Sequence, residues 1–456
     1  MTTPLNASLN APVPPTIDAG ATIIEKVTQL SSSKAVVVFL TFAFAYFLSA
    51  LIRAITATLS PTLTLEFGLQ ARDLGLLAGG YFLGFAAMQL PLGKWLDRFG
   101  PKKVIICFLS VAVIGCLAFA KASSFYGLLA ARMLCGAGVS ACLMAPLTGY
   151  RRWLAPGTQL RANSWMLMTG SMGMVASTLP VQWLMPIWGW RGIFFALAAM
   201  VVIAIVAIWL IVPVWQQTAP VSSAQPIPGS KSYAAVWAHP YFRSLLPLGF
   251  FSYGGLVAVQ TLWATPWMIK VAGYSATQAA TGLFWINVAM LCTFWLWGAI
   301  NPWLVRHGIS TDRLIVRGLP LSFIMIAIII IAAKAINTPA ISQFEGVNSL
   351  LQGLNTQSWL LWALYCMGCS FVSLAQPAIG MAFASELVGR ALSAFNLVIF
   401  AGVFVVQWGI GLMIDGFKAL GWAEIAAFQG AFGVFLGCCI ASYVYFVVTR
   451  PDRPDN

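Results

Sequence analysis

The chain has 456 residues, of which 60% are hydrophobic and only 8% are charged, and its formal net charge is +13. A soluble domain is nearer to half apolar and a quarter charged, so this composition indicates a membrane protein and excludes a soluble one. The apolar residues form long continuous runs rather than ten-residue alternating segments, which favours membrane-spanning helices over a β-barrel.

The apolar runs predict an all-α membrane protein with twelve transmembrane helices, because each run reaches the roughly 20 residues that one crossing needs. Six spans are expected in the first half, near 36–65, 74–93, 102–121, 124–147, 161–185 and 192–215. Six more are expected in the second half, near 244–269, 275–300, 313–335, 358–385, 391–415 and 424–449. The spans therefore divide into two groups of six.

A polar segment that contains several Pro and Ser residues separates the two groups and is typical of an interdomain linker. The predicted divisions are a disordered cytoplasmic N-terminal tail, a first six-helix bundle, a cytoplasmic linker, a second six-helix bundle and a cytoplasmic C-terminal tail, at 1–35, 36–215, 216–240, 241–449 and 450–456.

The Lys and Arg residues are divided unevenly between the two sides of these spans. With a cytoplasmic N-terminus, seventeen of the 25 fall in inside loops and tails, six fall outside and two lie within spans. This bias places both termini in the cytoplasm, and it explains the net charge as a topology signal rather than a nucleic-acid-binding surface. We therefore expect a multi-pass protein of the cell inner membrane, with the lipid bilayer and not nucleic acid as its partner.

The stretch 93–103, between the second and third spans, is unusually charged for this chain. It reads Gly-Lys-Trp-Leu-Asp-Arg-Phe-Gly-Pro-Lys-Lys and is expected to form a short cytoplasmic turn. Residues 95–100 match residues 303–308, which follow the eighth span, at four of six positions. This repeat relates the two halves of the chain, although Val305 stands where the first copy has Asp97.

Twelve spans, a central linker and this turn together resemble the major facilitator superfamily, whose signature loop has the pattern Gly-x-Leu-Ala-Asp-Arg-x-Gly-Arg-Lys. The matching residues are Gly93, Asp97, Arg98, Gly100 and Lys103. Further features similar to the family are Arg132 with Gly136 and Gly138, Trp190 with Arg191, and Gly389 with Arg390 and Ala391. The resemblance implies two pseudo-symmetric six-helix bundles and transport by alternating access.

The resemblance also implies that the turn is a cytoplasmic gate, in which Asp97 lies at a helix N-terminus of the other half and the glycines allow close helix approach. A carboxylate there gains a few tenths to about 2 kcal/mol, which is weak enough to break in each cycle. Arg98, Lys103 and Arg306, the counterpart of Arg98 in the second copy, are assigned to the same gate. Alternatively, the charge cluster only fixes the orientation of the protein in the membrane.

Two arginines are predicted to lie within spans, Arg53 in the middle of the first and Arg132 in the fourth. A cation there costs about 3 kcal/mol or more, so it normally faces a partner or a water-filled cavity. All twelve acidic residues lie in tails, loops or span ends. An anionic substrate would compensate the positive charge, and a resemblance to organic-anion, sugar-phosphate and nitrate carriers agrees. The alternative for each arginine is a structural cation that carbonyl or hydroxyl groups satisfy.

We therefore predict a secondary transporter of a small anion, with Arg53 as the main contact and Arg132 and Tyr81 as supports. Gln260 and Trp263 in the seventh span are further substrate-binding candidates, although helix packing explains each equally well. Trp267, Asn287, Gln376 and Asn396 belong to the same class of buried polar or aromatic candidates. No acidic or histidine residue lies deep in a span, so symport with a proton and exchange with another anion both stay open. A monomer without a cofactor is expected.

Three other functions were weighed. A copper importer of the same superfamily is the main alternative, because Met168 and Met172 share a helix face and Cys366 and Cys369 lie one turn apart, and soft sulfur ligands suit Cu(I). The competing explanation is that these residues fill helix contacts. A sensor that keeps the fold without transport is the next alternative. Enzymatic activity is not expected, since no catalytic, metal-ligand or phosphate-loop constellation is present in the sequence.

Overall fold

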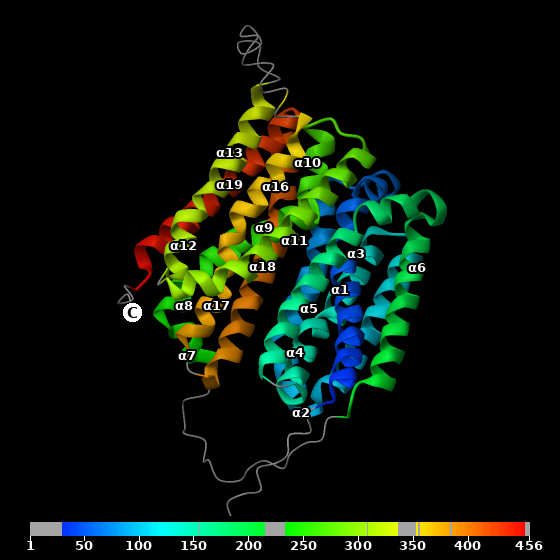
Figure 1. Ribbon diagram of the computed structural model, residues 1–456. Coiled ribbons are helices and arrows are strands. Elements are labelled where there is room, and N and C mark those ends of the chain that lie inside the picture. The colour runs from blue at the N-terminus through cyan, green and yellow to red at the C-terminus, as the bar shows by residue number, and fades with distance from the viewer. Residues whose placement is uncertain are drawn as a thin grey trace, which may run out of the picture.

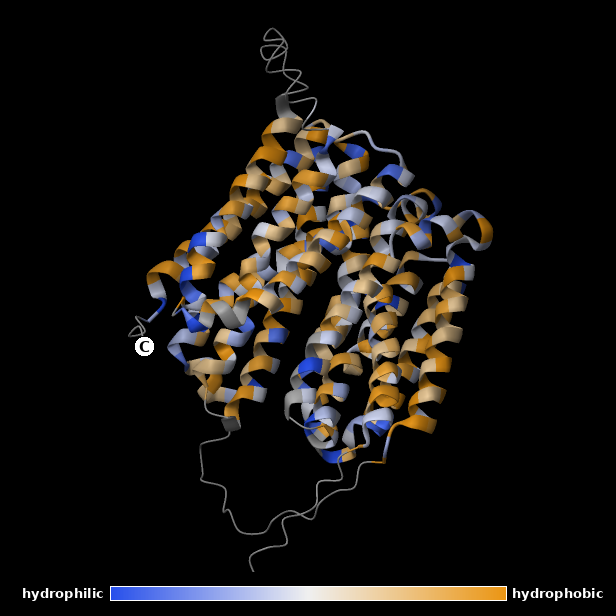
Figure 2. Ribbon diagram, in the orientation of Figure 1, coloured by the Kyte–Doolittle hydropathy of each residue, from blue (hydrophilic) through white to orange (hydrophobic). Residues whose placement is uncertain are grey.

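The computed structural model describes residues 30–451, apart from 155, 215–232, 308, 336–352, 354–355 and 384. Within these ranges the chain is helical and contains no strand. Eleven helical stretches of the described chain are long and apolar enough to cross a membrane. Figure 2 shows hydrophobic residues along these helices and hydrophilic residues gathered toward their ends, as a bilayer requires. The protein is therefore a multi-pass membrane protein.

The described helices of the first half of the chain lie together on one side of the molecule (Figure 1). They are α1 (Ser32–Phe67), α2 (Ala71–Lys121), α3 (Phe125–Val139), α4 (Ala141–Trp153), α5 (Pro156–Ala176) and α6 (Leu179–Ile211). The fourth predicted span consists of two helices, α3 and α4, which meet at Ser140.

The predicted turn at 93–103 is shorter than expected, because the residues on both sides of Gly100 are helical. α2 contains both the second and the third span and is interrupted only at Gly100, where φ is 75°. Glycine adopts this left-handed conformation without the steric penalty of a side chain. Pro101 follows at the first position of the next helical segment, where its missing N–H costs nothing. One residue therefore reverses the chain.

The fifth predicted span, 161–185, is broken in the structure at Ser177 and Thr178. Both hydroxyls donate to carbonyls three residues earlier, at 2.7 and 2.6 Å, and such local bonds compete with the regular helical ladder. Pro180 then occupies the first turn of α6. The Ser177 carbonyl at the break accepts a hydrogen bond from the Thr58 hydroxyl at 2.8 Å. This span therefore comprises α5 and the start of α6, and it is not among the eleven stretches above.

The described helices of the second half lie on the other side of the molecule (Figure 1). Those up to the eighth span are α7 (Tyr233–Ala238), α8 (Pro240–Pro247), the π-helix η1 (Leu248–Tyr253), α9 (Gly254–Ala258), the π-helix η2 (Val259–Trp263), α10 (Ala264–Lys270) and α11 (Ala276–Arg306). The others are α12 (Thr311–Gly318), α13 (Pro320–Ala335), α16 (Ser358–Cys369), the 3₁₀-helix η3 (Ser370–Leu374), α17 (Ala375–Ala382), α18 (Ser385–Ala419) and α19 (Glu424–Thr449).

The predicted tails and linker fall largely outside the described residues. Within the predicted linker 216–240, only 233–240 is described, and most of it is the helix α7 rather than an extended connection. α1 begins four residues earlier than the predicted start of the first span at residue 36.

The two groups of helices touch through α2 and α18 at the end of the molecule where α1 ends and α2 begins, which we name the Ala71 end. Asp415 of α18 accepts hydrogen bonds from the backbone N–H groups of Ala71 and Arg72, at 3.3 and 2.8 Å. These groups lack partners within their own helix because they belong to its first turn. A side chain at Gly75 would collide with the Gln407 carbonyl, so the backbones are in contact. Toward the opposite end, the Gly100 end, the two groups diverge (Figure 1).

A second cluster at the Ala71 end joins helices within the first half. Glu66 of α1 accepts a hydrogen bond from the Trp190 indole at 2.6 Å and pairs with Arg191 at 2.7 Å. The Arg191 guanidinium also lies 4.1 Å from the centre of the Trp190 ring and donates to the Ala122 carbonyl at 3.3 Å. Glu66 therefore links the first, third and sixth spans.

We expect Glu66→Gln to lower the thermal stability of the protein by about 1 kcal/mol. The loss is modest because both charged side chains are more than one third exposed, where an ion pair is screened by solvent, whereas the indole hydrogen bond to a charged group adds to it. Thermal unfolding of the protein in detergent measures the change. Lys121→Gln, at an exposed residue of the same end, is the control; equal midpoints for both variants would contradict the role given to Glu66.

Candidate functional site

Arg132 lies on α3 and is completely buried. Its Nη1 donates to the Ile52 carbonyl at 2.9 Å, and its Nη2 donates to the Arg53 carbonyl at 3.4 Å. Its guanidinium carbon lies 5.0 Å from the centre of the Tyr81 ring, which is the geometry of a cation–π contact. These contacts match the structural alternative for Arg132, because its hydrogen bonds hold the backbone of α1.

Arg53 follows Ile52 on α1, and it is more exposed than the residues on either side of it. Ile52 and Ala54 are 0% and 1% exposed, whereas the Arg53 side chain is partly exposed although it lies in the middle of the helix. Its guanidinium hydrogen-bonds to the Tyr46 hydroxyl, and Tyr81 and Tyr253 lie nearby. Its buried Nε has no hydrogen-bond partner in the described chain. The guanidinium thus retains donor capacity.

The groups around Arg53 come from both halves of the molecule. Tyr46 and Tyr81 belong to α1 and α2, while Tyr253 is the last residue of η1 in the second half. Among the residues that the structure describes, the ion pairs of Glu66, Asp73 and Glu424 lie at the ends of helices, and no carboxylate is paired with Arg53. The site is therefore a positive charge surrounded by tyrosines.

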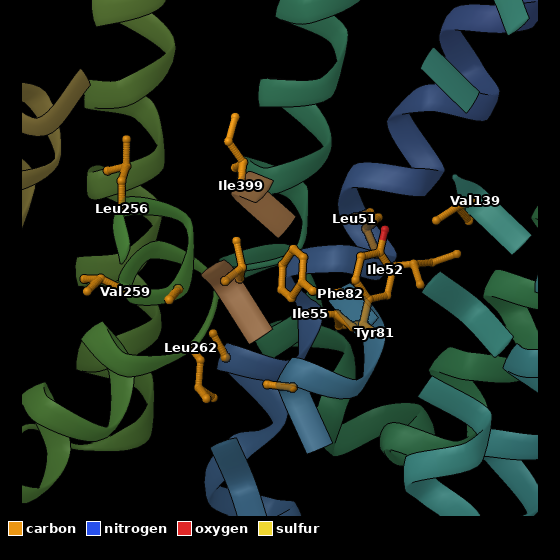
Figure 3. Close-up of a cluster of buried hydrophobic side chains, with 14 of the residues drawn as sticks. Leu51, Ile52, Ile55, Tyr81, Phe82, Val139, Leu256, Val259, Leu262 and Ile399 are labelled. Carbon is orange, nitrogen blue, oxygen red and sulfur yellow. The ribbon is translucent and has the colours of Figure 1, made fainter. Parts of the chain in front are cut away.

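Tyr81 is held in place by contacts on several sides. Its side chain is fully buried, and its hydroxyl donates to the Ser49 carbonyl at 3.4 Å. Figure 3 shows its ring beside Ile52 and Ile55 of α1. A side chain at Gly136 would collide with the Tyr81 carbonyl, so this glycine lets α3 approach α2 closely. Tyr81 thus lies next to both arginines, as its sequence position suggested.

Gln260 and Trp263 are buried in η2 and are both occupied by contacts within the second half. Gln260 donates to the Asn287 side chain at 2.8 Å, and the Trp263 indole donates to the Gln407 carbonyl at 3.1 Å. Gln376 likewise donates to Asn396, at 2.7 Å. None of these hydrogen bonds involves Arg53, and a substrate-binding role for Gln260 and Trp263 stays a prediction.

The predicted gate residues gather around the kink at Gly100. A side chain at Gly93 would meet nothing within 4 Å, and the Arg98 guanidinium lies 5.2 Å from the centre of the Phe99 ring. Lys103 and Arg306 are exposed at the Gly100 end. The side chains of Asp97 and Val305 lie outside the described ones, so the gate stays a prediction.

The methionines of the predicted copper site lie on α5, whereas Cys366 and Cys369 are buried on α16. Met168 and Met172 are 38% and 52% exposed on α5. Among the described residues, no group of three or more His, Cys, Asp or Glu side chains could hold a metal ion.

Sequence reasoning missed Tyr46 and Tyr253 as neighbours of Arg53. Tyr46 precedes Arg53 by seven residues, which is two helical turns and puts both on one face, so that spacing could have revealed it. Tyr253 comes from another span, and no local spacing connects it to Arg53.

The model of the Major Facilitator Superfamily matches residues 42–407. The chain belongs to this superfamily.

Solved structures agree with this fold. A D-xylose–proton symporter has a TM-score of 0.72 at 14% identity, with 91% of this chain and 98% of that chain covered. A bacterial homologue of the human lysosomal transporter Spinster, inward-facing and occupied, has a TM-score of 0.69 at 18% identity, with coverage of 92% and 97%. The predicted fold is confirmed.

Curated relatives of this superfamily member are transporters rather than enzymes. A gallate transporter of Pseudomonas putida is 23% identical over 283 residues, which is 55% of this chain and 62% of the relative. A 4-hydroxybenzoate transporter of Pseudomonas aeruginosa is 23% identical over 51% of this chain and 59% of its own length. A probable galactarate/D-glucarate transporter of Escherichia coli K12 is 23% identical over 82% and 84%. The chain thus spans about three fifths of the first two relatives.

We expect Arg132→Lys to destabilise the protein in the absence of any substrate. A lysine cannot hold two carbonyls with one planar group, and losing a buried hydrogen bond to a charged group costs about 1.5–3 kcal/mol. Thermal unfolding in detergent tests this, with the exposed Arg243→Lys as the matched control. A normal unfolding midpoint combined with weakened anion binding would instead identify Arg132 as a ligand contact.

Proposed function

We propose that this protein is a secondary transporter that carries a small organic anion across the inner membrane by alternating access. The observation that supports it is Arg53, a mid-span guanidinium that is partly exposed and has no paired carboxylate in the described chain. A cation in that position costs several kcal/mol unless a partner compensates it. A carboxylate of the substrate is the direct partner, since it accepts charge-assisted hydrogen bonds. Both termini are placed in the cytoplasm, and the protein acts as a monomer.

Arg132 is occupied by backbone carbonyls, so Arg53 is the one arginine available to a substrate. This favours a substrate with one negative charge. Arg132 already donates through both Nη atoms to the carbonyls of α1 and is fully buried. The Nε of each arginine has no partner in the described chain, but only Arg53 is partly exposed. Three tyrosines surround it, and their rings and hydroxyls suit a carboxylate attached to an aromatic or hydroxylated body. The named substrates of the relatives, gallate, 4-hydroxybenzoate and the sugar acids, are all organic acids, which favours this class over sugar phosphates and nitrate.

Tyr253 gives the substrate a way to connect the two halves during transport. Arg53 belongs to the first half and Tyr253 to the second, so a carboxylate bound to Arg53 can also accept from the Tyr253 hydroxyl. Such a bridge changes as the halves rock about the central site. Tyr81 and Arg132 support Arg53, and Gln260 and Trp263 line the path on the second half. The driving force is a coupled proton or an exchanged anion.

Arg53→Ala should weaken binding and uptake of 4-hydroxybenzoate about tenfold to hundredfold, because a hydrogen bond to a charged group contributes about 1.5–3 kcal/mol. Arg53→Lys should retain part of the activity, since the charge remains and the fork of donors is lost. Uptake into proteoliposomes, with benzoate, glucarate and phosphate as competitors, measures both effects, and Arg243→Ala is the exposed control. Transport like that of the wild type in both Arg53 variants would remove Arg53 from the site.

We also propose that Asp97 forms a gate at the Gly100 end. Asp97→Asn should slow uptake several-fold while the equilibrium affinity for the anion stays unchanged, because the carboxylate acts on the relative position of the halves and not on the substrate. Binding in detergent and uptake in vesicles are measured on the same variant. Asp455→Asn, in the last residues of the chain, is the matched control. A large loss of affinity would show that the stretch had been misinterpreted.

A further inference from the structure

A cavity lies at the Ala71 end, and Arg53 is not among the residues that line it. Its volume is about 930 Å³, which is within the range of sites for small molecules. The end of α1 and the start of α2 line it on one side. Trp263 of η2, the end of α10, the end of α18 and the start of α19 line it on the other. Because both halves form its walls, its shape depends on how they are positioned.

The lining of this cavity carries three cations, Lys270, Lys418 and Arg72, against two carboxylates, Asp415 and Glu424. The Lys270 ammonium is 3.6 Å from Glu424 Oε1, and the Lys418 ammonium is 4.0 Å from the same oxygen. Two cations therefore share one carboxylate, and each keeps about half of its side chain exposed. An ammonium group has three donors, so both can accept a further anionic partner.

The other charged groups at the cavity already have partners. The Asp415 carboxylate is occupied by the N–H groups of Ala71 and Arg72. The Arg72 guanidinium is 3.8 Å from Asp73, a weak contact between exposed groups. A small anion that enters the cavity therefore meets two ammonium groups whose shared carboxylate compensates only one of them.

The remaining lining is largely apolar. Leu65 and Pro61 of α1 face the cavity from the first half, and Ile269 and Phe428 face it from the second. Leu65 is 86% exposed, so its side chain is accessible to a ligand in the cavity. A ligand with a flat apolar body and one anionic group would cover this surface and reach the lysines together.

We propose that this cavity is a second anion site, separate from Arg53, and that it takes an aryl monoanion such as an aryl sulfonate or aryl carboxylate. The anionic group pairs with Lys270 and Lys418, and the ring lies between Leu65 and Phe428. A ligand that contacts both walls stabilises the arrangement in which the Ala71 end is closed. Its occupancy therefore slows the cycle without competing at Arg53. Binding at this cavity does not rest on the proposed function, whereas its effect on the cycle does.

Calorimetric titration of the purified full-length protein with sodium 2-naphthalenesulfonate tests the site. We expect saturable binding that falls at least tenfold in the Lys270→Gln/Lys418→Gln double variant and in Leu65→Trp, which fills the cavity. Lys121→Gln, at the same end but outside the cavity, should bind like the wild type. The neutral 2-naphthalenemethanol should bind at least tenfold more weakly than the sulfonate.

The Arg53→Ala variant separates this site from the central one, and it should keep the wild-type affinity for the sulfonate. Absence of saturable binding to the wild type would overturn the proposal, as would unchanged binding to the double variant or equal affinity for the neutral alcohol. Loss of binding in Arg53→Ala would place the sulfonate at the central site and would overturn it too. The unfolding midpoint of each variant without ligand shows whether it is folded. If the lysine double variant is unstable, the affinity of Leu65→Trp for the sulfonate tests the site instead.

Discussion

A guanidinium buried in the middle of a membrane protein must find its hydrogen-bond acceptors within the protein, and Arg132 meets this requirement with the carbonyls of α1. Its bonds to Ile52 and Arg53 fix α3 against α1, while Gly136 allows α2 to approach with Tyr81 in front of the guanidinium. Because Arg132 is committed in this way, Arg53 is presented on a rigid segment while its own side chain keeps unused donors. The position of Arg53, the proposed anion contact, therefore depends on the hydrogen bonds that Arg132 makes to α1.

The contact between the halves at the Ala71 end is built to separate. Side chains that interdigitate resist sliding, but here glycines bring backbones together: a side chain at Gly75 would meet the Gln407 carbonyl, and one at Gly411 would meet the Ala71 carbonyl. The Asp415 carboxylate adds two hydrogen bonds to N–H groups that water can also satisfy. Opening this end therefore breaks few specific contacts, as a rocking transporter requires.

Span lengths, the division into two groups and the position of the buried arginines could be predicted from the sequence, because hydrocarbon thickness and the cost of charge act on each span separately. The break in the fifth span could not, since it depends on the hydroxyls of Ser177 and Thr178 turning back to their own helix and on Thr58 from α1 satisfying a freed carbonyl. A turn within 93–103 could be predicted, but its length could not, because the charges indicated a loop of several residues and only Gly100 is non-helical.

Tyr253 shows why the site itself was harder to predict than the fold. It lies at the end of the π-helix η1, and the π-helix η2 follows after one short α segment. A π segment bonds each N–H to the carbonyl five residues back, so the side chains beyond it rotate away from the 3.6-residue repeat. The face of the seventh span that meets Arg53 is therefore not the face that a regular helix would present. Since π segments are concentrated at functional sites, these two distortions mark the seventh span as the element through which the second half contacts the anion site.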